Sequence, residues 1–462
     1  MKQRSQTAAN LRYSTIDGLY ATPWLHFTNP GSFITAGLLN ELFAIGPFWF
    51  GIVVAMPAVA NAINIFLVPL VSKFMNVREM MLSFGWLNLG AWTSGAVAIA
   101  FSPVGEAGQI GLFFTAIFAV LACSGSLMGI GFVAWLTDFV PSRIRGRYMG
   151  RRNRLTSFAT IAFMVLSIGV LNFFGATRNV YLTLIALSIV MRFASMLYVH
   201  RIQSPDPTGG AIAQANWGRE LANLREQKSL LRFIAFGSVA GFFLAFQGAL
   251  ATIFAFGALG ATAAQFTGFS LFATISSAIF LPIWGRVIDK HGSLPTIIIS
   301  LVAWRLNDLG YLFITPDTLE WLNLMWFTGG ALGGGFMLGT FTLLLKLIPK
   351  TSRSAGISLN LTLTSIAGAT APMLAGLLTE NISAVPFDTM TAYRIGFGVA
   401  ILCALLSALI LVGMKEPETD PRHNTIFGAM RSLKQMAVTN GLALFTSNFF
   451  VRTQRKRPND RR

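Results

Sequence analysis

Two stretches of the chain decide the fold: VPSRIRGRYMG at residues 140–150 and IPKTSRSAGIS at residues 348–358. A shift of 208 residues places the proline and the second arginine of the first stretch on the proline and the arginine of the second. The same shift carries the LTS tripeptide at 155–157 onto the one at 363–365. The chain therefore contains an internal repeat that spans nearly half its length, and this repeat predicts two related halves.

A second pair of stretches supports the repeat. PLVSKFMN from residue 69 aligns with PIWGRVID from residue 282 at a shift of 213 residues. Parallel repeats of this kind are a transporter architecture, in which the substrate site lies near the midplane between the halves.

The composition indicates a membrane protein. Of 462 residues, 54% are hydrophobic and only 11% are charged, whereas a soluble domain carries roughly a quarter charged residues. This disfavours a soluble enzyme and a nucleic-acid binder, despite the formal net charge of +17. Cys123 and Cys403 each lie in an apolar run, so we expect two inert packing residues rather than a disulfide.

Runs of about 20 mostly apolar residues mark membrane spans. Twelve such runs occur: 18–41, 48–71, 79–103, 109–136, 154–175, 179–200, 231–256, 263–284, 294–315, 320–347, 355–379 and 392–414. The first contains His26, Asn29 and Pro30 in its middle, so we expect it to face a protein interior or a wet cavity.

The connections between these runs carry their positive charge unevenly. Eighteen Lys and Arg residues lie on the even-numbered connections or at the adjoining ends of the runs, but only Arg178 and Arg394 lie on or beside the odd ones. Because Lys and Arg are translocated poorly, the even side is predicted to be cytoplasmic. Both tails are basic as well, so both are predicted to be cytoplasmic, and the number of spans must be even. The membrane topology then accounts for the net positive charge of the chain, and no polyanionic partner is needed to explain it.

These patterns predict an all-α integral membrane protein with twelve transmembrane helices in two pseudo-symmetric six-helix bundles. The expected divisions are a cytoplasmic N-terminus (1–17), an N-terminal bundle (18–200), a cytoplasmic linker (201–230), a C-terminal bundle (231–414) and a basic cytoplasmic tail (415–462). Residues 1–11 lack the apolar core of a signal peptide, so we expect the first span to insert uncleaved.

Two loop motifs resemble those of the major facilitator superfamily, over about residues 12–418. GRVIDKHG at 285–292 is similar to its loop motif, and DFVPSRIRG at 138–146 is similar to its pattern of an acid, six residues and Arg-Gly. The resemblance implies cytoplasmic gate clusters that hold the halves closed, formed here by Asp138, Arg145, Gly146, Gly285, Arg286, Asp289, Lys290 and Arg353.

Each half departs from the motifs at one anchor. Asn76 stands where the first half should carry the loop-motif acid, and Lys346 stands where the second half should carry the acid opposite Arg353. These departures bear on the balance between the conformations, and they are compatible with a role other than transport.

The resemblance also implies that helices 1, 4, 7 and 10 line a central cavity that opens alternately to each side. Polar and aromatic residues of those helices are the candidate cavity residues: His26, Asn29, Glu41, Trp135, Gln247, Asn323 and Trp326. Ser124 and Ser126 could also contact the solute, but a Ser in a membrane helix usually donates a hydrogen bond to the backbone of its own helix instead. The glycines at 329–335 are interpreted as close helix packing.

Arg305 and Asp308 are charged residues near the middle of the ninth run. Three positions apart, they share a helix face and can pair, and we interpret them as a structural ion pair ahead of a transport role. Arg192 is expected to snorkel and Asp17 to be solvated. A proton symporter using Glu41 or His26 and an uncoupled carrier both remain open.

No metal site, cofactor motif or catalytic triad is found, so we expect no enzyme activity, no cofactor and no metal. The expected partners are a small-molecule solute, with or without H⁺, and the lipid bilayer, with no nucleic acid and the chain a monomer. A bacterial-type plasma (inner) membrane is the expected location, with both termini cytoplasmic. Residues 426–437 are interpreted as an amphipathic helix on the membrane, and the basic end of the tail, 452–462, as holding anionic lipid or as disordered.

Two functions compete. The first is a secondary active or facilitated transporter, or permease, of a small solute, with an aromatic cavity that favours an amphipathic or apolar solute. A polyanion would need basic residues in the middle of helices 1, 4, 7 or 10, and none is present. The alternative is a non-transporting member of the superfamily, a membrane assembly or pigment- or lipid-delivery factor.

Overall fold

The computed structural model describes residues 2–101, 107–140, 142–203, 224, 226–348, 353–381, 388–417, 425–426 and 428–432. All regular elements in these ranges are helices. The N-terminal half contains α1 (Lys2–Thr28), α2 (Phe33–Gly37), the π-helix η1 (Leu38–Leu42), α3 (Pro47–Val71), α4 (Val77–Phe101), α5 (Ala107–Phe139), α6 (Ser142–Phe174) and α7 (Arg178–His200).

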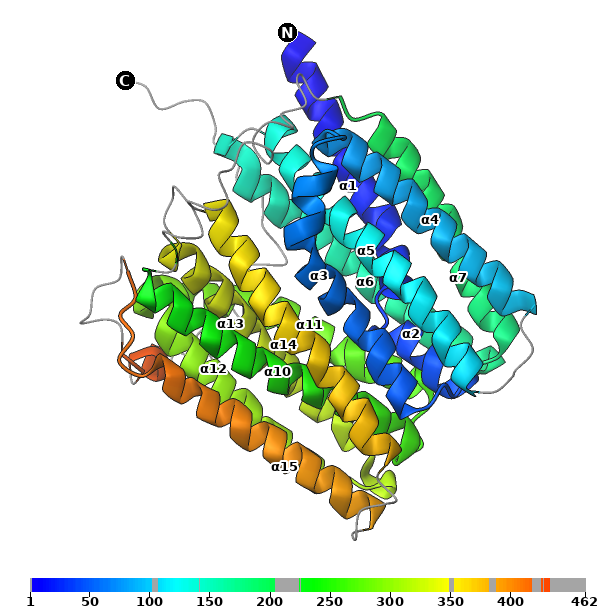
Figure 1. The fold of residues 1–462 in the computed structure, drawn as a ribbon, viewed down its shortest axis with the longest axis vertical. Helices are drawn as coiled ribbons and strands as arrows, with labels where there is room; N and C mark the ends of the chain where they lie inside the picture. The colour runs from blue at the N-terminus through cyan, green and yellow to red at the C-terminus, as the bar shows by residue number, and fades with distance from the viewer. Residues whose placement is uncertain are drawn as a thin grey trace, which may run out of the picture.

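The C-terminal half repeats this order. It contains α10 (Lys228–Gly257), α11 (Ala263–His291), α12 (Ser293–Asp308), η2 (Leu309–Leu312), η3 (Pro316–Thr318), α13 (Trp321–Leu347), α14 (Arg353–Glu380), α15 (Thr389–Ser407) and η6 (Ala408–Leu411). The two halves form two bundles that lie side by side, with α1–α7 on one side of Figure 1 and α10–α15 on the other. Most of the predicted linker, 204–223, lies outside the described residues.

The fold is that of an all-helical integral membrane protein with two related helical bundles. Nine helices of the described part are long and apolar enough to cross a membrane. The other long helices are α1, α4 and α12, and α1 and α12 contain the polar and charged residues that the sequence shows in the first and ninth runs.

The first predicted span, 18–41, is not one continuous helix. Helix α1 ends at Thr28, and a short turn leads to α2. The hydroxyls of Ser32 and Thr35 both donate to the carbonyl oxygen of His26, the latter at 2.9 Å. These bonds satisfy a backbone acceptor that the end of α1 leaves free, which is how a break is tolerated at membrane depth.

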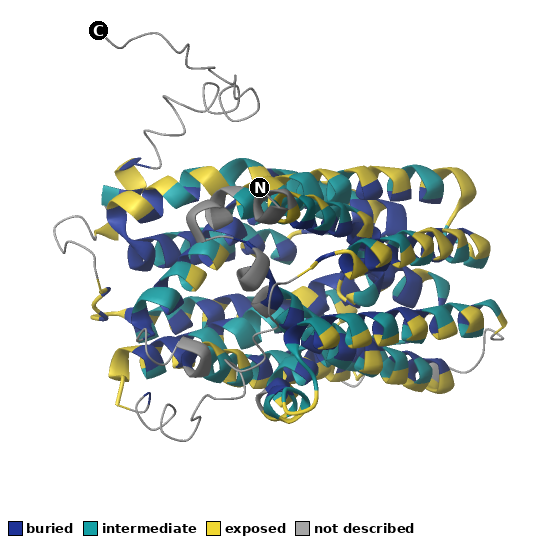
Figure 2. Cartoon of the chain, turned by 90° about the horizontal axis from the view of Figure 1, so that it is seen from above, coloured by how far each residue is buried: buried dark blue, intermediate teal, exposed yellow. Residues whose placement is uncertain are grey.

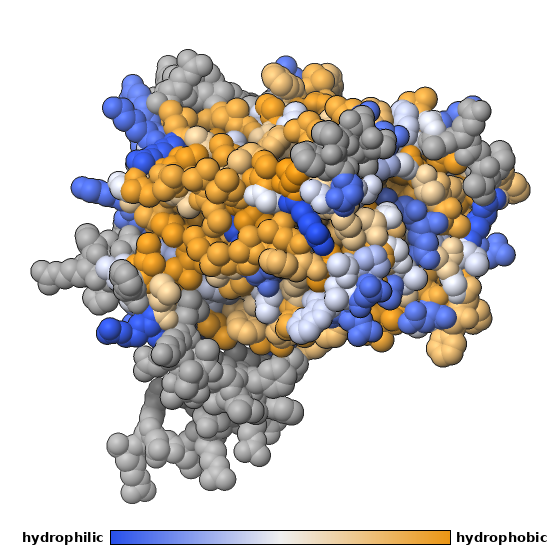
Figure 3. Space-filling model, turned by 90° about the horizontal axis from the view of Figure 1, so that it is seen from below, coloured by the Kyte–Doolittle hydropathy of each residue, from blue (hydrophilic) through white to orange (hydrophobic). Residues whose placement is uncertain are grey.

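Large apolar side chains cover the outside of the molecule. Phe101 and Phe173 are 83% and 87% exposed, and Phe66, Phe313 and Leu409 are also exposed. Figure 2 shows the exposed residues along the outer sides of the helices, and Figure 3 shows a broad apolar area on one face. A continuous surface of this kind fits lipid rather than water.

The connections lie at two ends of the bundles. We call the end with Met75, Ile202, His291 and Ile348 the basic end, and the end with Gly46, Gly175, Thr262 and Asn381 the opposite end.

The predicted tail helix is described only at 425–426 and 428–432. Ala429 is fully buried, and the Ser432 hydroxyl lies 2.6 Å from Nε2 of His291 at the end of α11. Ile426 and Met430 are exposed. The remainder of the predicted helix and the basic residues 452–462 lie outside the described residues.

Candidate functional site

The two halves meet closely at the opposite end, through α3 and α14. A Cβ atom at Gly51 of α3 would lie 2.3 Å from the carbonyl oxygen of Pro372, and one at Gly376 of α14 would lie 2.3 Å from that of Pro47. Only glycine fits at such distances, because each backbone lies directly against the other helix. The molecule is therefore closed at the opposite end.

Two carboxylates strengthen this closure, one from each half. Glu41 of η1 accepts a hydrogen bond from the backbone N–H of Ala263, at the start of α11. Glu380, at the end of α14, accepts one at 3.4 Å from the backbone N–H of Phe48, at the start of α3. Each carboxylate thus meets the N-terminus of a helix of the other half, where negative charge is favoured.

A central cavity of about 580 Å³ lies between the halves. Its polar lining comes from Asn29, Asn61, Thr252, Ser270, Thr364 and Ser365, and its aromatic lining from Phe50, Phe266 and Trp326. Asn61 is held in place from α5, since the Ser126 hydroxyl donates to its Oδ1 at 2.7 Å. Hydrogen-bonding groups from both halves therefore face one space of the size that binds a small solute.

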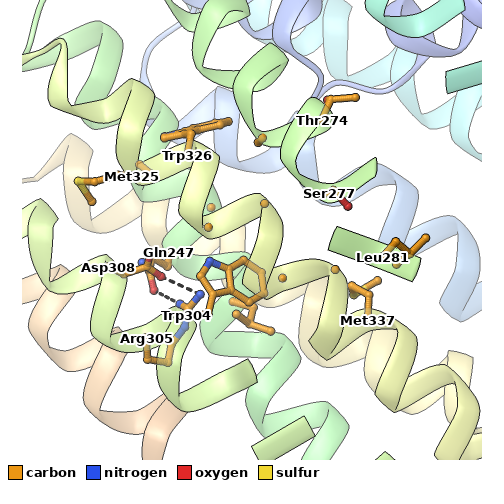
Figure 4. Close-up of a pocket in the computed structure, with 18 of the residues that line it drawn as sticks. Gln247, Thr274, Ser277, Leu281, Trp304, Arg305, Asp308, Met325, Trp326 and Met337 are labelled. Atoms are coloured by element: carbon orange, nitrogen blue, oxygen red, sulfur yellow. Dashed lines mark hydrogen bonds and ion pairs between the residues drawn. The ribbon is translucent and has the colours of Figure 1, made fainter. Parts of the chain in front are cut away.

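A second cavity, of about 640 Å³, lies among α10, α11, α12 and α13 (Figure 4). Ser157 of α6 also lines it, so it reaches the boundary between the halves. Gly248 and Trp326 line both cavities, which therefore adjoin at these two residues.

A buried ion pair lines this second cavity. Arg305 Nη2 lies 2.7 Å from Asp308 Oδ2, and Arg305 Nη1 donates to Oε1 of Gln247. The guanidinium also lies 4.5 Å from the ring centroid of Trp304. The expected pairing of Arg305 with Asp308 is thus present, but it is placed on a cavity wall beside Gln247 rather than within a solid helix interface.

Aromatic residues continue the wall beyond the ion pair. The Trp326 indole N–H donates to the Tyr311 hydroxyl at 3.1 Å, and Tyr311 stacks on Phe397 of α15 with ring centroids 4.6 Å apart. The ring of Trp326 thus has a fixed position where the two cavities adjoin.

The structure brings three of the predicted cavity residues to the cavities. Asn29 lines the central cavity, Gln247 lines the second, and Trp326 lines both. These assignments as solute-binding residues stay predictions.

The other four predicted cavity residues lie elsewhere. His26 stands between Phe33 and Phe163, with Nε2 3.5 Å from the Thr160 hydroxyl. Glu41 is at the closure, and Asn323 donates to the carbonyl oxygen of Glu320 at 3.1 Å. Trp135 is fully buried in the core of the N-terminal half, beside Val77 and Leu136.

The predicted gate residues are only partly described. The side chains of Asp138, Arg145, Gly146 and Arg353 lie outside the described residues. Gly285 is partly buried, whereas Arg286, Asp289 and Lys290 are exposed at the basic end. Asp289 makes no ion pair or hydrogen bond with any described residue.

Lys346, the departure in the second half, is matched by a different acid. Its Nζ lies 2.7 Å from Glu416 Oε1, and the Glu416 carboxylate also accepts from the backbone N–H groups of Ser293 and Leu294, each at 2.9 Å. Burial favours the neutral acid, but these hydrogen bonds outweigh it and lower the pKa of Glu416 below its ordinary value. Glu416 therefore joins α15, α12 and α13 at the basic end.

Asn76, the departure in the first half, has a local role. Its Oδ1 accepts from the backbone N–H of Glu79 at 2.9 Å, and Glu79 Oε2 accepts from the backbone N–H of Asn76 at 3.0 Å. This reciprocal pair caps the N-terminus of α4.

The expectations for Asp17 and Arg192 are wrong. Both are buried, and Asp17 Oδ1 lies 3.7 Å from Arg192 Nη1 and accepts from the Ser195 hydroxyl at 2.7 Å. Arg152 Nη2 lies 3.6 Å from Asp17 Oδ2. The cluster joins α1, α6 and α7, so neither residue is solvated or snorkels.

Sequence reasoning missed several lining residues. Asn61, Thr364 and Ser365 come from α3 and α14, which were not expected to line the cavity, and Trp304 and Tyr311 come from the α12–η2 segment. A signal for Asn61 was available, because an amide inside an apolar helix needs a partner or a cavity. Among the described residues, no group of three or more His, Cys, Asp and Glu could hold a metal ion.

Comparison with known proteins finds a match to one protein family. Residues 229–453 match the family model described as Major Facilitator Superfamily. No curated protein matches the sequence.

Solved structures share the fold. A point mutant of the nucleoside transporter NupG is similar with a TM-score of 0.63 and 13% identity, over 88% of this chain and 100% of that one. A D-xylose–proton symporter has a TM-score of 0.65 and 14% identity, over 89% and 98%. The inward-open xylose transporter XylE from E. coli has 0.60 and 14%, over 93% and 99%. Identities this low show the fold alone. The family model matches residues 229–453, just under half of the chain, and the solved structures share the fold over most of its length, so the chain is similar to proteins of the Major Facilitator Superfamily.

Proposed function

We propose that the chain is a secondary active or facilitated transporter of a small solute that works by alternating access between its halves. The observation that carries the proposal is the central cavity, which both halves line and which lies inside the closure formed by α3 and α14. A solute bound there can be released when the two halves rock about it.

The uneven distribution of Lys and Arg supports a definite orientation of the protein in the membrane. With the Lys- and Arg-rich basic end in the cytoplasm of a bacterial-type inner membrane, both termini are cytoplasmic and the closed end faces outward. A solute in the cavity would then be shielded from the outside by the closure of α3 against α14. We further propose that the chain works as a monomer of two bundles, with the linker and the basic tail on the cytoplasmic surface and the tail at anionic lipid.

The lining supports a small amphipathic solute. The central cavity combines amide and hydroxyl groups with the rings of Phe50, Phe266 and Trp326. Nucleosides and D-xylose, the solutes of the structurally similar transporters, combine hydroxyl groups with a compact body, so nucleosides and pentoses belong in the first panel of solutes.

Flux in proteoliposomes tests the proposal. The full-length protein is reconstituted, and counterflow of labelled nucleosides, pentoses, amino acids and aromatic acids is measured. We expect counterflow for at least one class, reduced about tenfold or more by Asn61→Ala or Trp326→Ala, since one lost hydrogen bond or ring contact is worth about 1.4 kcal/mol or more. Asn323→Ala is the matched control, because Asn323 lines neither cavity.

The opposite result has a defined meaning. No counterflow for the whole panel, together with a protein partner that remains bound through purification, would favour the assembly or delivery factor over the transporter.

A further inference from the structure

We infer that the Arg305–Asp308 pair is a coupling site that carries one proton together with one monovalent organic acid, the proton on Asp308 and the solute carboxylate on Arg305. This inference rests on the proposed transport function and names its solute class. It concerns the second cavity, whose wall the pair forms (Figure 4).

The Arg305 guanidinium has a hydrogen-bond donor that is free to bind an acceptor from a solute. Its side chain is 2% exposed, and two of its nitrogens are occupied by Asp308 and Gln247. Arg305 Nε is buried and has no hydrogen-bond partner among the described residues. An unsatisfied buried donor costs about 1–3 kcal/mol, and a carboxylate in the cavity would satisfy the guanidinium.

The chain contains a second buried pair that serves as a comparison. Arg192 and Asp17 are equally buried, and Arg192 Nε likewise has no hydrogen-bond partner among the described residues, but neither residue lines either of the two cavities. Asp17 accepts from Ser195 and lies near Arg152, whereas Asp308 accepts from Asn307 at 3.3 Å and faces the cavity. Burying an ion pair is often no gain over apolar packing, so a pair on a cavity wall needs a different explanation. Ionisable residues within a membrane are functional by default.

Charge balance determines what can bind. Arg305 and Asp308 are the only charged side chains that line either cavity among the described residues, so the closed pair gives a net charge of zero. A solute carboxylate that displaces Asp308 from Arg305 would add one negative charge, at a cost of several kcal/mol in a low-dielectric site. A proton taken from water onto Asp308 restores the net charge to zero. Binding of the acid and binding of the proton are therefore coupled one to one.

Asp308 is the group that makes this coupling depend on pH. The titratable groups that face it are Arg305 on its own helix and Tyr311 on η2, and neither residue type ordinarily titrates between pH 6 and 8. The neighbouring helices present other chemistry: α10 the amide of Gln247, α11 the hydroxyls of Thr274 and Ser277, α13 the rings and thioethers of Trp326 and Met325, and α15 the ring of Phe397.

The rest of the cavity fits the body of the solute. Leu244, Trp304, Met325, Trp326 and Met337 give it a mainly apolar and aromatic lining. The structure therefore favours an aromatic or branched aliphatic monocarboxylate over a dicarboxylate or a sugar acid.

Binding to the purified full-length protein in detergent tests the inference. Benzoate, phenylacetate and indole-3-acetate are titrated by calorimetry in two buffers of different protonation enthalpy. The amides of the same acids serve as uncharged controls. We expect the acids to bind at least tenfold more tightly than the amides at pH 6, with one proton taken up per acid, and with affinity falling up to tenfold per pH unit toward pH 8.

Variants separate the two roles. Asp308→Asn should bind acids with no proton uptake and no change of affinity between pH 6 and 8. Arg305→Gln should lose acid binding. If Asp308→Asn does not fold, Arg305→Gln with Asp308→Asn keeps the site neutral, and this double variant should fold but bind no acid. Asp17→Asn, with Arg192→Gln where stability requires it, is the matched control and should keep the proton uptake of the wild type.

Three results would overturn the inference: no binding by any acid of the panel, equal binding of acids and amides, or unchanged proton uptake in Asp308→Asn or the double variant. Counterflow of an uncharged solute without proton uptake would also overturn it, yet leave the proposed transport function standing.

Discussion

Glu41 of the N-terminal half accepts a hydrogen bond from the backbone N–H of Ala263, the first residue of α11 in the C-terminal half. Glu380 makes the corresponding contact in the other direction, to Phe48 near the start of α3. The halves are thus held at the opposite end by two contacts of the same kind, each from a carboxylate of one half to the start of a helix in the other half.

Glu41→Gln should weaken the closure at the opposite end. The carboxylate at a helix N-terminus is worth about 0.3–1 kcal/mol, so the closed-to-open ratio should fall by a factor of about two to five. Spin-label distances across the opposite end measure the ratio. Glu320→Gln is the control, because Glu320 is exposed and its carboxylate forms no hydrogen bond or ion pair with the described residues of the other half; an equal shift in both variants would contradict the assignment.

Asp17→Asn should destabilise the N-terminal half. Removing one partner of a buried ion pair costs about 3–5 kcal/mol, because Arg192 then remains buried without its counter-charge. Thermal unfolding in detergent measures the loss. Adding Arg192→Gln should restore much of it, and Asp317→Asn, at an exposed site, should have no effect.

Glu416→Gln should loosen the basic end of the C-terminal half. Hydrogen bonds to a charged group contribute about 1.5–3 kcal/mol, and Glu416 accepts from Lys346 and from two backbone N–H groups of α12.

The pH dependence of this effect has a definite sign. The pKa of Glu416 is lowered in the fold, so its contribution is fully present above the ordinary value near 4.3 and is lost as the pH falls through the folded value. The difference in melting temperature between the wild type and Glu416→Gln should therefore be constant from pH 7 to 5 and shrink below pH 4. A difference that grows on acidification would contradict the assignment.

The apolar runs and the charge bias predicted the helical membrane fold, because both are local properties that lipid imposes on any spanning chain. The internal repeat predicted its division into two related halves. The break after Thr28 was not predicted. The polarity of His26 and Asn29 marks the place, but whether such a segment bends or breaks depends on Ser32 and Thr35, which reach back to the end of α1.

The site was less predictable than the fold. The pairing of Arg305 with Asp308 follows from helix geometry, but their placement on a cavity depends on how α12 packs against α10 and α13. Asp17 illustrates the same limit: its partners, Arg152 and Arg192, lie more than a hundred residues away in the sequence. No local sequence pattern specifies which residues so far apart in the chain come into contact.

Gly51→Ala and Gly376→Ala should prevent closure at the opposite end without unfolding either half. The added methyl group at each position would lie 2.3 Å from a backbone carbonyl oxygen of the other half, and a backbone cannot turn aside as a flexible side chain can. Because the clash exists only while α3 and α14 are in contact, its cost falls on the closed state alone.

The variants should therefore populate the form that is open at the opposite end. The measurement is the labelling rate of a cysteine introduced at Val54, which lines the central cavity, with a membrane-impermeant reagent added on that side. Gly90→Ala and Gly241→Ala are matched controls, since a Cβ atom at either meets nothing within 4 Å. Labelling of the two pairs at the same rate would show that the approach of α3 to α14 does not control access to the cavity.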